Sequence, residues 1–226
     1  MTVETVTLTH VGVSLALHRL SDGDPSVRPL LLLHGLGEHT PDELPDHLSP
    51  WPGPVWGLDF TGHGASSIPR GGGYTAELLM ADVDHALGHL GEVTIHGRGL
   101  GAYLGLLVAG ARPELVTGTI LADGSGIDGG GESPHSPALV IPANPARRGT
   151  PDPFALAELA SDVRPDDYAG IYARQALEFS GMATPITVTA VVRPPWLRAV
   201  VAEPGVATST LSEALARYST YRRPNA

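Results

Sequence analysis

The residues best suited to chemistry in this sequence are histidines, an aspartate and an arginine that lie in or beside glycine-rich turns. His96 and Arg98 come just before Gly99, and Asp123 comes directly before Gly124. An imidazole titrates near neutral pH and can act as a general base, while a carboxylate can orient it. A guanidinium beside a helix N-terminus can bind an anion. These residue types therefore suit acid–base catalysis or the binding of a small anion.

Short apolar runs that end in glycine-rich turns should position these residues. Residues 92–110, EVTIHGRGLGAYLGLLVAG, predict a buried strand, a tight turn over residues 97–101 and an apolar helix. Continuous apolar runs at residues 29–33, 55–59 and 116–122 predict further strands that are buried on both faces of a sheet. Strands that alternate with helices in this way predict an α/β fold with a mainly parallel sheet.

Hydrophobic periodicity predicts the remaining elements. Alternating residues at 5–20 predict an antiparallel hairpin that turns near Gly12. Helical spacing at residues 75–90, with Thr75 as N-cap and Gly91 after the last turn, predicts a helix. Five further segments complete the set: helices at residues 154–160, 166–179 and 211–218, a strand at 185–192 and a strand-like segment at 200–208. The interval between the last two strands leaves little room for a helix.

Three motifs lie in the order and spacing of one protein family. The pair His34-Gly35 directly follows a predicted strand, and residues 59–66, DFTGHGAS, are similar to D-x-x-G-x-G-x-S. Residues 97–101, GRGLG, are similar to the G-x-S-x-G nucleophile elbow. On these motifs, residues 29–124 resemble the α/β-hydrolase superfamily. The resemblance implies an α/β-hydrolase-type sheet that is mainly parallel and covered by helices on both faces.

The resemblance also implies a domain organisation. We expect one α/β-hydrolase-like domain over residues 1–226, because a chain of this length commonly forms a single core. In the family, a lid or cap is inserted at the place of residues 125–184. The first part of this interval has the Gly- and Pro-rich composition of a loop. We therefore expect residues 125–184 to be a short lid insertion.

The resemblance locates three catalytic groups, a serine nucleophile, an acid and a histidine, which act as one unit. The nucleophile position is Gly99, which has no side chain that can attack. The strand that should carry the acid runs into residues 193–196, RPPW, which contain no carboxylate. Thr208 is nearest to the histidine position, and no histidine follows His135. The chain therefore resembles a degenerate member of the family that lacks the Ser-acid-His triad.

Two alternatives for catalysis stay open. Some members of the family place the acid where this chain has Asp123, although an aspartate before a glycine also suits a turn. A rearranged site could use His34, His63 or His96, with Ser66 as a nucleophile. Against this, the His-Gly pair of the family is largely architectural, and His63 and Ser66 resemble a pattern that stabilises a loop.

The retained turn also predicts a ligand site. The resemblance implies that the backbone amides of Leu36, which follows Gly35, and Leu100 converge as an oxyanion hole. Arg98, beside the helix N-terminus, would favour a carboxylate or another small anion there. Without a serine side chain, Gly99 should leave extra room. The opposing interpretation is that Arg98 points to solvent or pairs with a surface acid.

Composition excludes several kinds of chemistry. The 226 residues include no cysteine, and all 14 basic residues are arginine, which excludes disulfides, thiolate sites and lysine Schiff bases. A net charge of −10 disfavours nucleic acid and anionic membranes as partners. We expect no cofactor. We also expect no metal site, because the spacing of Glu38, His39, His63 and His96 is irregular. The N-terminus does not resemble a signal peptide, and no apolar run approaches ~18 residues, so we expect a cytoplasmic protein.

These observations favour a hydrolase-like pseudoenzyme. It would be non-catalytic or would bind a small, anionic ligand in the vestigial active-site cleft. One alternative is an active hydrolase or lyase that acts on a small ester-like substrate with non-standard residues. The other is a structural or interaction protein whose pocket has collapsed. The oligomeric state is not predicted by the sequence.

Overall fold

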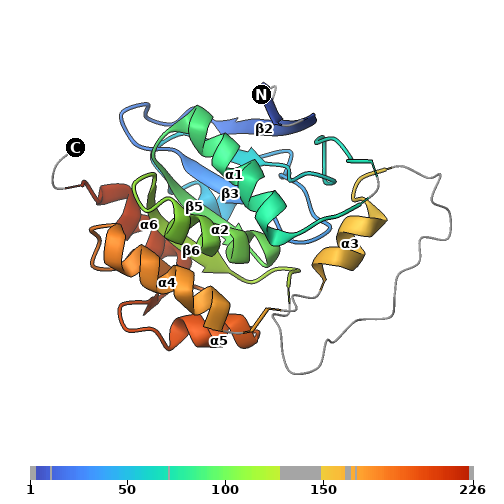
Figure 1. Ribbon diagram of the computed structural model, residues 1–226. Helices are drawn as coiled ribbons and strands as arrows, with labels where there is room; N and C mark the ends of the chain where they lie inside the picture. Colours follow the sequence, from blue (N-terminus) through green and yellow to red (C-terminus); the bar gives the residue numbers. More distant parts are fainter. Residues whose placement is uncertain are drawn as a thin grey trace.

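The computed structural model describes residues 4–10, 12–70, 72–127, 149–160, 164–165 and 167–223. Figure 1 shows one twisted sheet with helices packed against it. The elements in chain order are β1 (Glu4–His10), β2 (Val13–Ser21), β3 (Leu30–Leu33), the 3-10 helix η1 (Asp46–Leu48), β4 (Val55–Leu58), α1 (Ala76–Leu90), β5 (Val93–Arg98), α2 (Leu100–Ala111), β6 (Val116–Ala122), α3 (Pro153–Leu159), α4 (Asp167–Phe179), β7 (Ile186–Val188), α5 (Pro195–Val201), β8 (Ala207–Thr208) and α6 (Leu211–Thr220).

The sheet has the order β1-β2-β4-β3-β5-β6-β7-β8 among the residues that the structure describes. β1 pairs with β2, and β2 with β4, in antiparallel orientation, whereas all the other pairs are parallel. The prediction of a mainly parallel α/β sheet is confirmed. The predicted hairpin is also present, as the antiparallel pair at the edge of the sheet. Both predicted caps of α1 are confirmed: Thr75 accepts a hydrogen bond from the Leu78 amide, and Gly91 has a φ of 75°.

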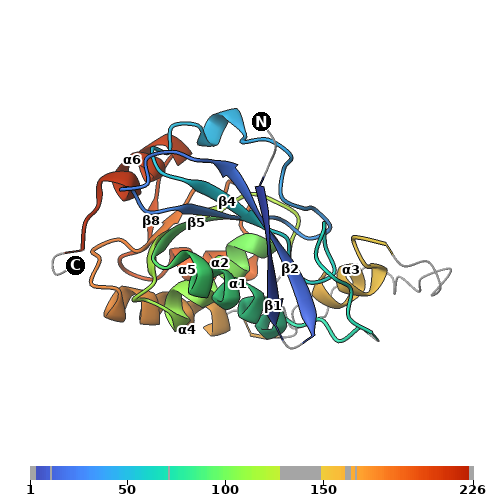
Figure 2. The ribbon, with the colours of Figure 1, turned by 90° about the horizontal axis from the view of Figure 1, so that it is seen from above.

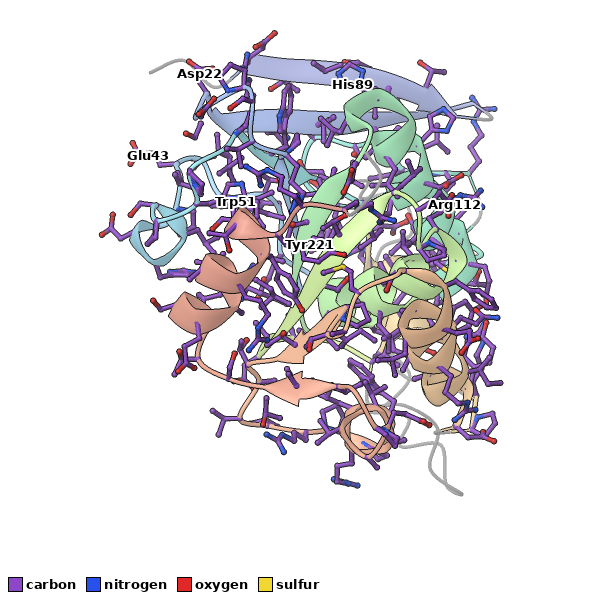
Figure 3. All side chains as sticks on the ribbon, turned by 90° about the vertical axis from the view of Figure 1, so that its left-hand side faces the viewer. Asp22, Glu43, Trp51, His89, Arg112 and Tyr221 are labelled. Atoms are coloured by element: carbon purple, nitrogen blue, oxygen red, sulfur yellow. The ribbon has the colours of Figure 1, made fainter. Side chains whose placement is uncertain are left out.

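Helices lie on both faces of the sheet (Figure 2), and each face buries its own core. Leu31 and Leu33 of β3 belong to the larger core, which includes the apolar residues of α1 and α2. Leu30 and Leu32 face the other way, into a smaller core with η1 and α6. Trp51 lies in this smaller core, beside α6 (Figure 3), where its indole N–H donates to the Arg28 carbonyl at 3.2 Å. Alternation along one strand thus requires cover on both faces.

Helix α2 is the centre of the larger core and is buried almost all round. Its first turn approaches β3 so closely that a Cβ on Gly101 would lie 2.2 Å from the Leu33 carbonyl oxygen. At its other end, a Cβ on Gly110 would lie 2.6 Å from the carbonyl oxygen of Tyr172 in α4. Glycine at these positions allows α2 to contact both neighbours directly.

The interval expected to form a lid contains two described helices. α4 packs against α2, within the layer that covers the sheet (Figure 1). α3 lies apart from α4, and its Asp152 cap accepts a hydrogen bond from the Tyr74 hydroxyl at 2.7 Å. Residues 128–148, 161–163 and 166, which include His135, lie outside the described residues. The assignment of residues 125–184 as a lid stays a prediction.

Three expectations for the C-terminal part are wrong. The interval between the last two strands does hold a helix, α5, and residues 200–201 belong to it instead of to a strand. Pro194 and Pro195 start this helix, since proline suits a first helical turn. The predicted strand at residues 185–192 is only Ile186–Val188, because the amides of Thr189 and Ala190 both donate to the Leu121 carbonyl and those of Val191 and Val192 donate to the Asp123 carboxylate. The final strand is confined to Ala207–Thr208.

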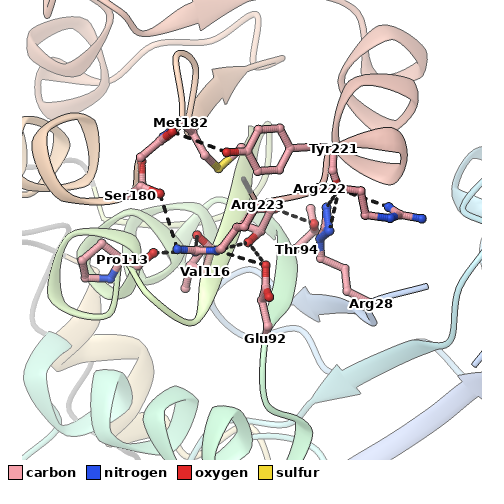
Figure 4. A network of polar contacts seen from close by, with 12 residues as sticks. Arg28, Glu92, Thr94, Pro113, Val116, Ser180, Met182, Tyr221, Arg222 and Arg223 are labelled. Atoms are coloured by element: carbon pink, nitrogen blue, oxygen red, sulfur yellow. Dashed lines mark hydrogen bonds and ion pairs between the residues drawn. The ribbon is translucent and has the colours of Figure 1, made fainter. Parts of the chain in front are cut away.

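Arginines tie the C-terminal segment to the rest of the fold (Figure 4). Arg28 donates to the carbonyl oxygens of Tyr218 and Tyr221, at the end of α6. Arg223 donates to Glu92 at 3.2 Å and to the Pro113 carbonyl at 2.6 Å. A cation at a helix C-terminus satisfies carbonyls that have no partner within the helix. The last helix is therefore held against the sheet at its C-terminal end.

Among the described residues, no helix combines the length and the apolar character that a membrane crossing requires.

Candidate functional site

The predicted turn is present between β5 and α2, with Gly99 as the single residue between them. Gly99 has φ 51° and ψ −112°, a conformation that L side chains rarely adopt. Its carbonyl accepts the amides of Ala102 and Tyr103 at 3.1 Å, and the amide of Gly101 donates to the His34 carbonyl at 3.0 Å. The turn therefore keeps a strained geometry, supported by both α2 and the His-Gly loop.

Two backbone amides converge above this turn, as the sequence predicts. The amide of Leu36 donates to the Ser125 carbonyl oxygen at 2.8 Å, and the amide of Leu100 donates to the same oxygen at 2.9 Å. Both distances lie within the range of about 2.7–3.1 Å that suits an oxyanion hole. The oxygen bound in this structure belongs to the protein's own main chain.

The main chain after β6 also fills the space above Gly99. A Cβ placed on Gly99 would lie 1.9 Å from the Ser125 carbonyl oxygen and 2.5 Å from the Gly124 carbonyl carbon. A Cβ on Gly126 would lie 2.4 Å from the Leu100 nitrogen. The expectation that Gly99 leaves extra room is therefore wrong, because a Gly-Ser-Gly segment occupies the position where a nucleophile would project.

Arg98 has partners within the protein. Its Nη1 lies 2.9 Å from Glu38 Oε2, and its Nε donates to the Asp123 carbonyl at 3.2 Å. The same Glu38 oxygen accepts the Gly35 amide at 3.0 Å. Ser125 Oγ donates to the Leu36 carbonyl at 2.6 Å. Of the two interpretations of Arg98, the structure has the one in which the guanidinium pairs with a surface acid.

Asp123 anchors the loop that follows β7. Its two carboxylate oxygens accept the amides of Val191 and Val192, each at 2.8 Å. Asp123 directly follows the parallel strand β6, at the position of the alternative acid of the family. Thr208, nearest to the histidine position, is the exposed last residue of β8, and the chain turns into α6 directly after it.

His96 is buried in β5, on the side of the sheet facing the η1 loop. Burial lowers the pKa of His96 to about 3, with further lowering by His47 and Arg98. Its imidazole is therefore neutral at physiological pH. The rings of His96 and His47 are 6.4 Å apart between centroids. A pocket of about 160 Å³ lies here, lined in part by both histidines, Glu38 and Arg98.

The other candidate histidine and serine side chains stabilise loops. His34 Nδ1 bonds the Gly35 carbonyl at 2.8 Å, and its Nε2 accepts the Phe60 amide at 3.2 Å, which places the proton on Nδ1. Burial lowers the pKa of His34 to about 3. Ser66 Oγ donates to the Asp59 carbonyl at 2.6 Å and accepts the Ala16 amide at 2.9 Å. His63 Nδ1 bonds the Thr61 carbonyl at 3.2 Å. Each of these contacts is made to the main chain.

Sequence reasoning missed the anchoring role of Asp59. Its carboxylate accepts the amides of Thr40 and Ala65, both at 2.7 Å, and lies 3.0 Å from His18 Nε2. Burial alone would raise the pKa of Asp59, but the hydrogen bonds from His18, Ala65 and Thr40 lower it to about 2. The motif at residues 59–66 includes this aspartate, but nothing in the motif indicates that its partner on β2 is His18. Asp59 thus fixes two loops at the carboxyl end of the sheet.

A second pocket lies beside the elbow, between the ends of β6 and β7, the start of α2 and helix α5. Its volume is about 280 Å³, and its lining includes Gly99, Ala102, Ile127, Trp196 and Leu197. Neither Trp196 nor any other residue of α5 could be assigned to a site from the sequence, since α5 itself was not predicted. The described residues include no group of three or more histidine or carboxylate side chains arranged to hold a metal ion.

Many solved structures are similar to this chain, and three of them illustrate the range. An esterase from a Rhodococcus species aligns with 97% of this chain and 99% of its own length, at a TM-score of 0.68 and 16% identity. The thioesterase domain from the curacin biosynthetic pathway aligns with 97% of this chain and 98% of its own length, at a TM-score of 0.61 and 17% identity. An α/β hydrolase from Novosphingobium aromaticivorans, with 25% identity and a TM-score of 0.48, aligns over 53% of this chain. This chain spans only 44% of that protein's length.

The amino-acid sequence matches a family model over most of its length. No curated protein matches this chain significantly. The model of the alpha/beta hydrolase family matches residues 30–224, which include every predicted motif and the described C-terminal elements. The strand order, the sharp turn after β5 and the two converging amides agree with this match. The chain belongs to the α/β hydrolase family.

Proposed function

We propose that this protein is a non-catalytic α/β-hydrolase-like protein that binds a small molecule beside its vestigial elbow. The observation that supports this most directly is that the Leu36 and Leu100 amides both donate to the Ser125 carbonyl oxygen. In a hydrolase of this fold, such donors stabilise the negatively charged oxygen of the tetrahedral intermediate. In this protein, a substrate oxygen could bind to the two amides only by displacing the Ser125 carbonyl oxygen.

The surroundings of the elbow support the same proposal. Gly99 offers no nucleophile, and a substrate carbon above it would meet the main chain of residues 124–126. A general base must lie within hydrogen-bond reach of a nucleophile and be oriented by a third group. Asp123 accepts two main-chain amides, and His96 is buried on the side facing η1. These groups hold the fold together, and none is paired as a base with a nucleophile.

The remaining parts of the proposal concern partners and location. We propose a small molecule as the partner, with neither nucleic acid nor membrane involved, in agreement with the net charge of −10. We also propose that the protein acts in the cytoplasm. Two proteins of similar fold are described as an esterase and a thioesterase domain, so ester and thioester hydrolysis are the activities to test.

Purified protein should not hydrolyse short-chain nitrophenyl esters or acyl thioesters faster than buffer alone, because the elbow lacks a nucleophile and a free oxyanion site. Initial rates measured at several protein concentrations check this expectation, with an active esterase as the positive control for each substrate. Asp123→Asn and His96→Gln should give the same background rate. Turnover that rises with protein concentration and disappears in either variant would show a working non-standard site and would overturn the proposal.

A further inference from the structure

The pocket of about 280 Å³ beside Gly99, which we term the elbow pocket, has a firm apolar wall. Ala102, Trp196 and Leu197 are all at most 3% exposed, so their packing fixes this wall. The Trp196 indole N–H donates to the Ile127 carbonyl at 2.9 Å, and its ring packs edge-on against Tyr103. Since the polar atom of the indole is already satisfied, the surface that Trp196 offers to the pocket is apolar.

The volume of the elbow pocket restricts the size of its ligand. Pockets for drug-sized molecules measure about 300–1,000 Å³ and are mostly apolar with a few polar groups. The elbow pocket lies just below this range. It therefore suits a molecule of the size of a short-chain acid or alcohol.

Two charged residues line the elbow pocket, and they differ in how far their polar atoms have partners. Asp123 lines it, but both carboxylate oxygens accept main-chain amides. Arg193 also lines it, and among the described residues its side chain makes one long hydrogen bond, from Nε to the Ala190 carbonyl at 3.5 Å. No carboxylate within the described part of the chain pairs with Arg193, whereas Arg98 pairs with Glu38. Arg193 is thus a cation of the pocket for which the described residues supply no acidic partner.

The edge of the elbow pocket is apolar as well. Val191 and Val192 are 85% and 74% exposed, although their amides are held by Asp123. Val192 also lines the pocket, next to Arg193. The two valines thus add a small exposed apolar surface to the pocket edge. The charge and the apolar surface therefore lie side by side at this edge.

We propose that the elbow pocket binds a small monocarboxylate with an apolar tail. The carboxylate pairs with Arg193, and the tail lies against Trp196 and Leu197. A guanidinium binds a carboxylate through two parallel N–H groups, which selects it over a neutral or cationic head group. The inference rests on the proposed function and moves the recognition of the anion from Arg98, which already pairs with Glu38, to Arg193.

Calorimetric titration with hexanoate, hexanol and hexylamine tests this inference, since the three probes share a tail and differ in head group. Hexanoate should bind most tightly. Arg193→Gln should weaken hexanoate about tenfold, the effect of losing one charge-assisted contact, and should leave hexanol unchanged. Arg70→Gln, which removes an exposed arginine outside the pocket, is the matched control and should change neither affinity. Thermal midpoints of the variants verify that they are folded.

Equal affinity for the three probes, no binding of hexanoate, or a loss that Arg70→Gln reproduces would overturn the inference. The ester assay on the same preparations separates this result from the proposed function. Hydrolysis together with Arg193-dependent binding of hexanoate would overturn only the claim that the protein is non-catalytic. Absence of both hydrolysis and hexanoate binding would overturn only the identity of the ligand.

Discussion

Gly99→Ser is expected to destabilise the protein by about 2–6 kcal/mol and not to create an esterase. A side chain at φ 51° and ψ −112° is strained by about 1–3 kcal/mol in a conformation of this kind. The new Cβ would also lie 1.9 Å from the Ser125 carbonyl oxygen, so residues 124–126 must move. Such overpacking costs about 1–3 kcal/mol. The introduced hydroxyl would still have no histidine base, because no histidine follows His135.

Urea denaturation of wild type and Gly99→Ser measures the loss of stability, and the nitrophenyl ester assay measures activity. Gly88→Ser is the control, because Gly88 lies in α1 and a Cβ there meets nothing within 4 Å. That control should raise the stability by a few tenths of a kcal/mol, since serine suits a helix better than glycine does. A Gly99→Ser protein as stable as wild type would contradict the filled space above the turn. One that hydrolyses esters would contradict the loss of the base.

The protein should lose about 2 kcal/mol of stability between about pH 7.5 and pH 5.5, because it buries neutral histidines. Burial lowers the pKa of His34 and His96 to about 3 and also lowers that of His63, against an ordinary value of 6.5. A histidine whose pKa is lower in the folded protein than in the unfolded chain takes up its proton only on unfolding. The stability is therefore complete above pH 6.5 and is lost as the pH falls below that value. Between about pH 7.5 and pH 5.5, His34 and His96 together lower the free energy of unfolding by about 3 kcal/mol.

Asp82 acts in the opposite direction. Burial raises the pKa of Asp82 to about 6 from 3.8, despite its hydrogen bonds from the amide and hydroxyl of Thr61. The folded protein therefore takes up a proton here first, and stability rises as the pH falls through 6. This contribution offsets about 1 kcal/mol of the loss at pH 5.5, which leaves the net figure of about 2 kcal/mol.

Urea midpoints at the two pH values measure the loss. His96→Gln should reduce it by about 1 kcal/mol, because the unfolded chain then takes up one proton fewer. His89→Gln is the matched control, since His89 lies exposed on α1 (Figure 3) and its replacement should leave the loss unchanged. Equal stability at both pH values would show that the buried imidazoles are not held neutral.

Much of the fold could be predicted because its determinants are local. Four-residue apolar strands, the Thr75 cap and the glycines around Gly99 each signal an element through nearby residues. The family match at residues 30–224 confirms the superfamily that the motifs indicated. α5 was missed because its seven residues are too few to show helical periodicity. β7 ends where the main-chain amides turn to acceptors on Leu121 and Asp123, and Asp123 lies 68 residues from Val191 in the sequence.

The sequence could not predict that residues 124–126 fill the space above Gly99, because this depends on contacts between distant segments. The resemblance indicated that the Leu36 and Leu100 amides converge, but their acceptor at Ser125 follows another strand. The sequence offered only a small, flexible Gly-Ser-Gly stretch as a signal. In the same way, Arg98 and Glu38 are 60 residues apart, and their pairing follows from the close approach of two loops. Such details require the packed structure.

The central claim of the proposed function is that the protein's own Ser125 carbonyl takes the place that an oxyanion would occupy between the Leu36 and Leu100 amides. Through-hydrogen-bond scalar couplings, measured by NMR on isotope-labelled protein in solution, test it most directly. We predict couplings from the amide nitrogens of both Leu36 and Leu100 to the Ser125 carbonyl carbon, with slow exchange of both amide protons. Absence of both couplings, together with rapid exchange of these two amides with solvent, would contradict the claim.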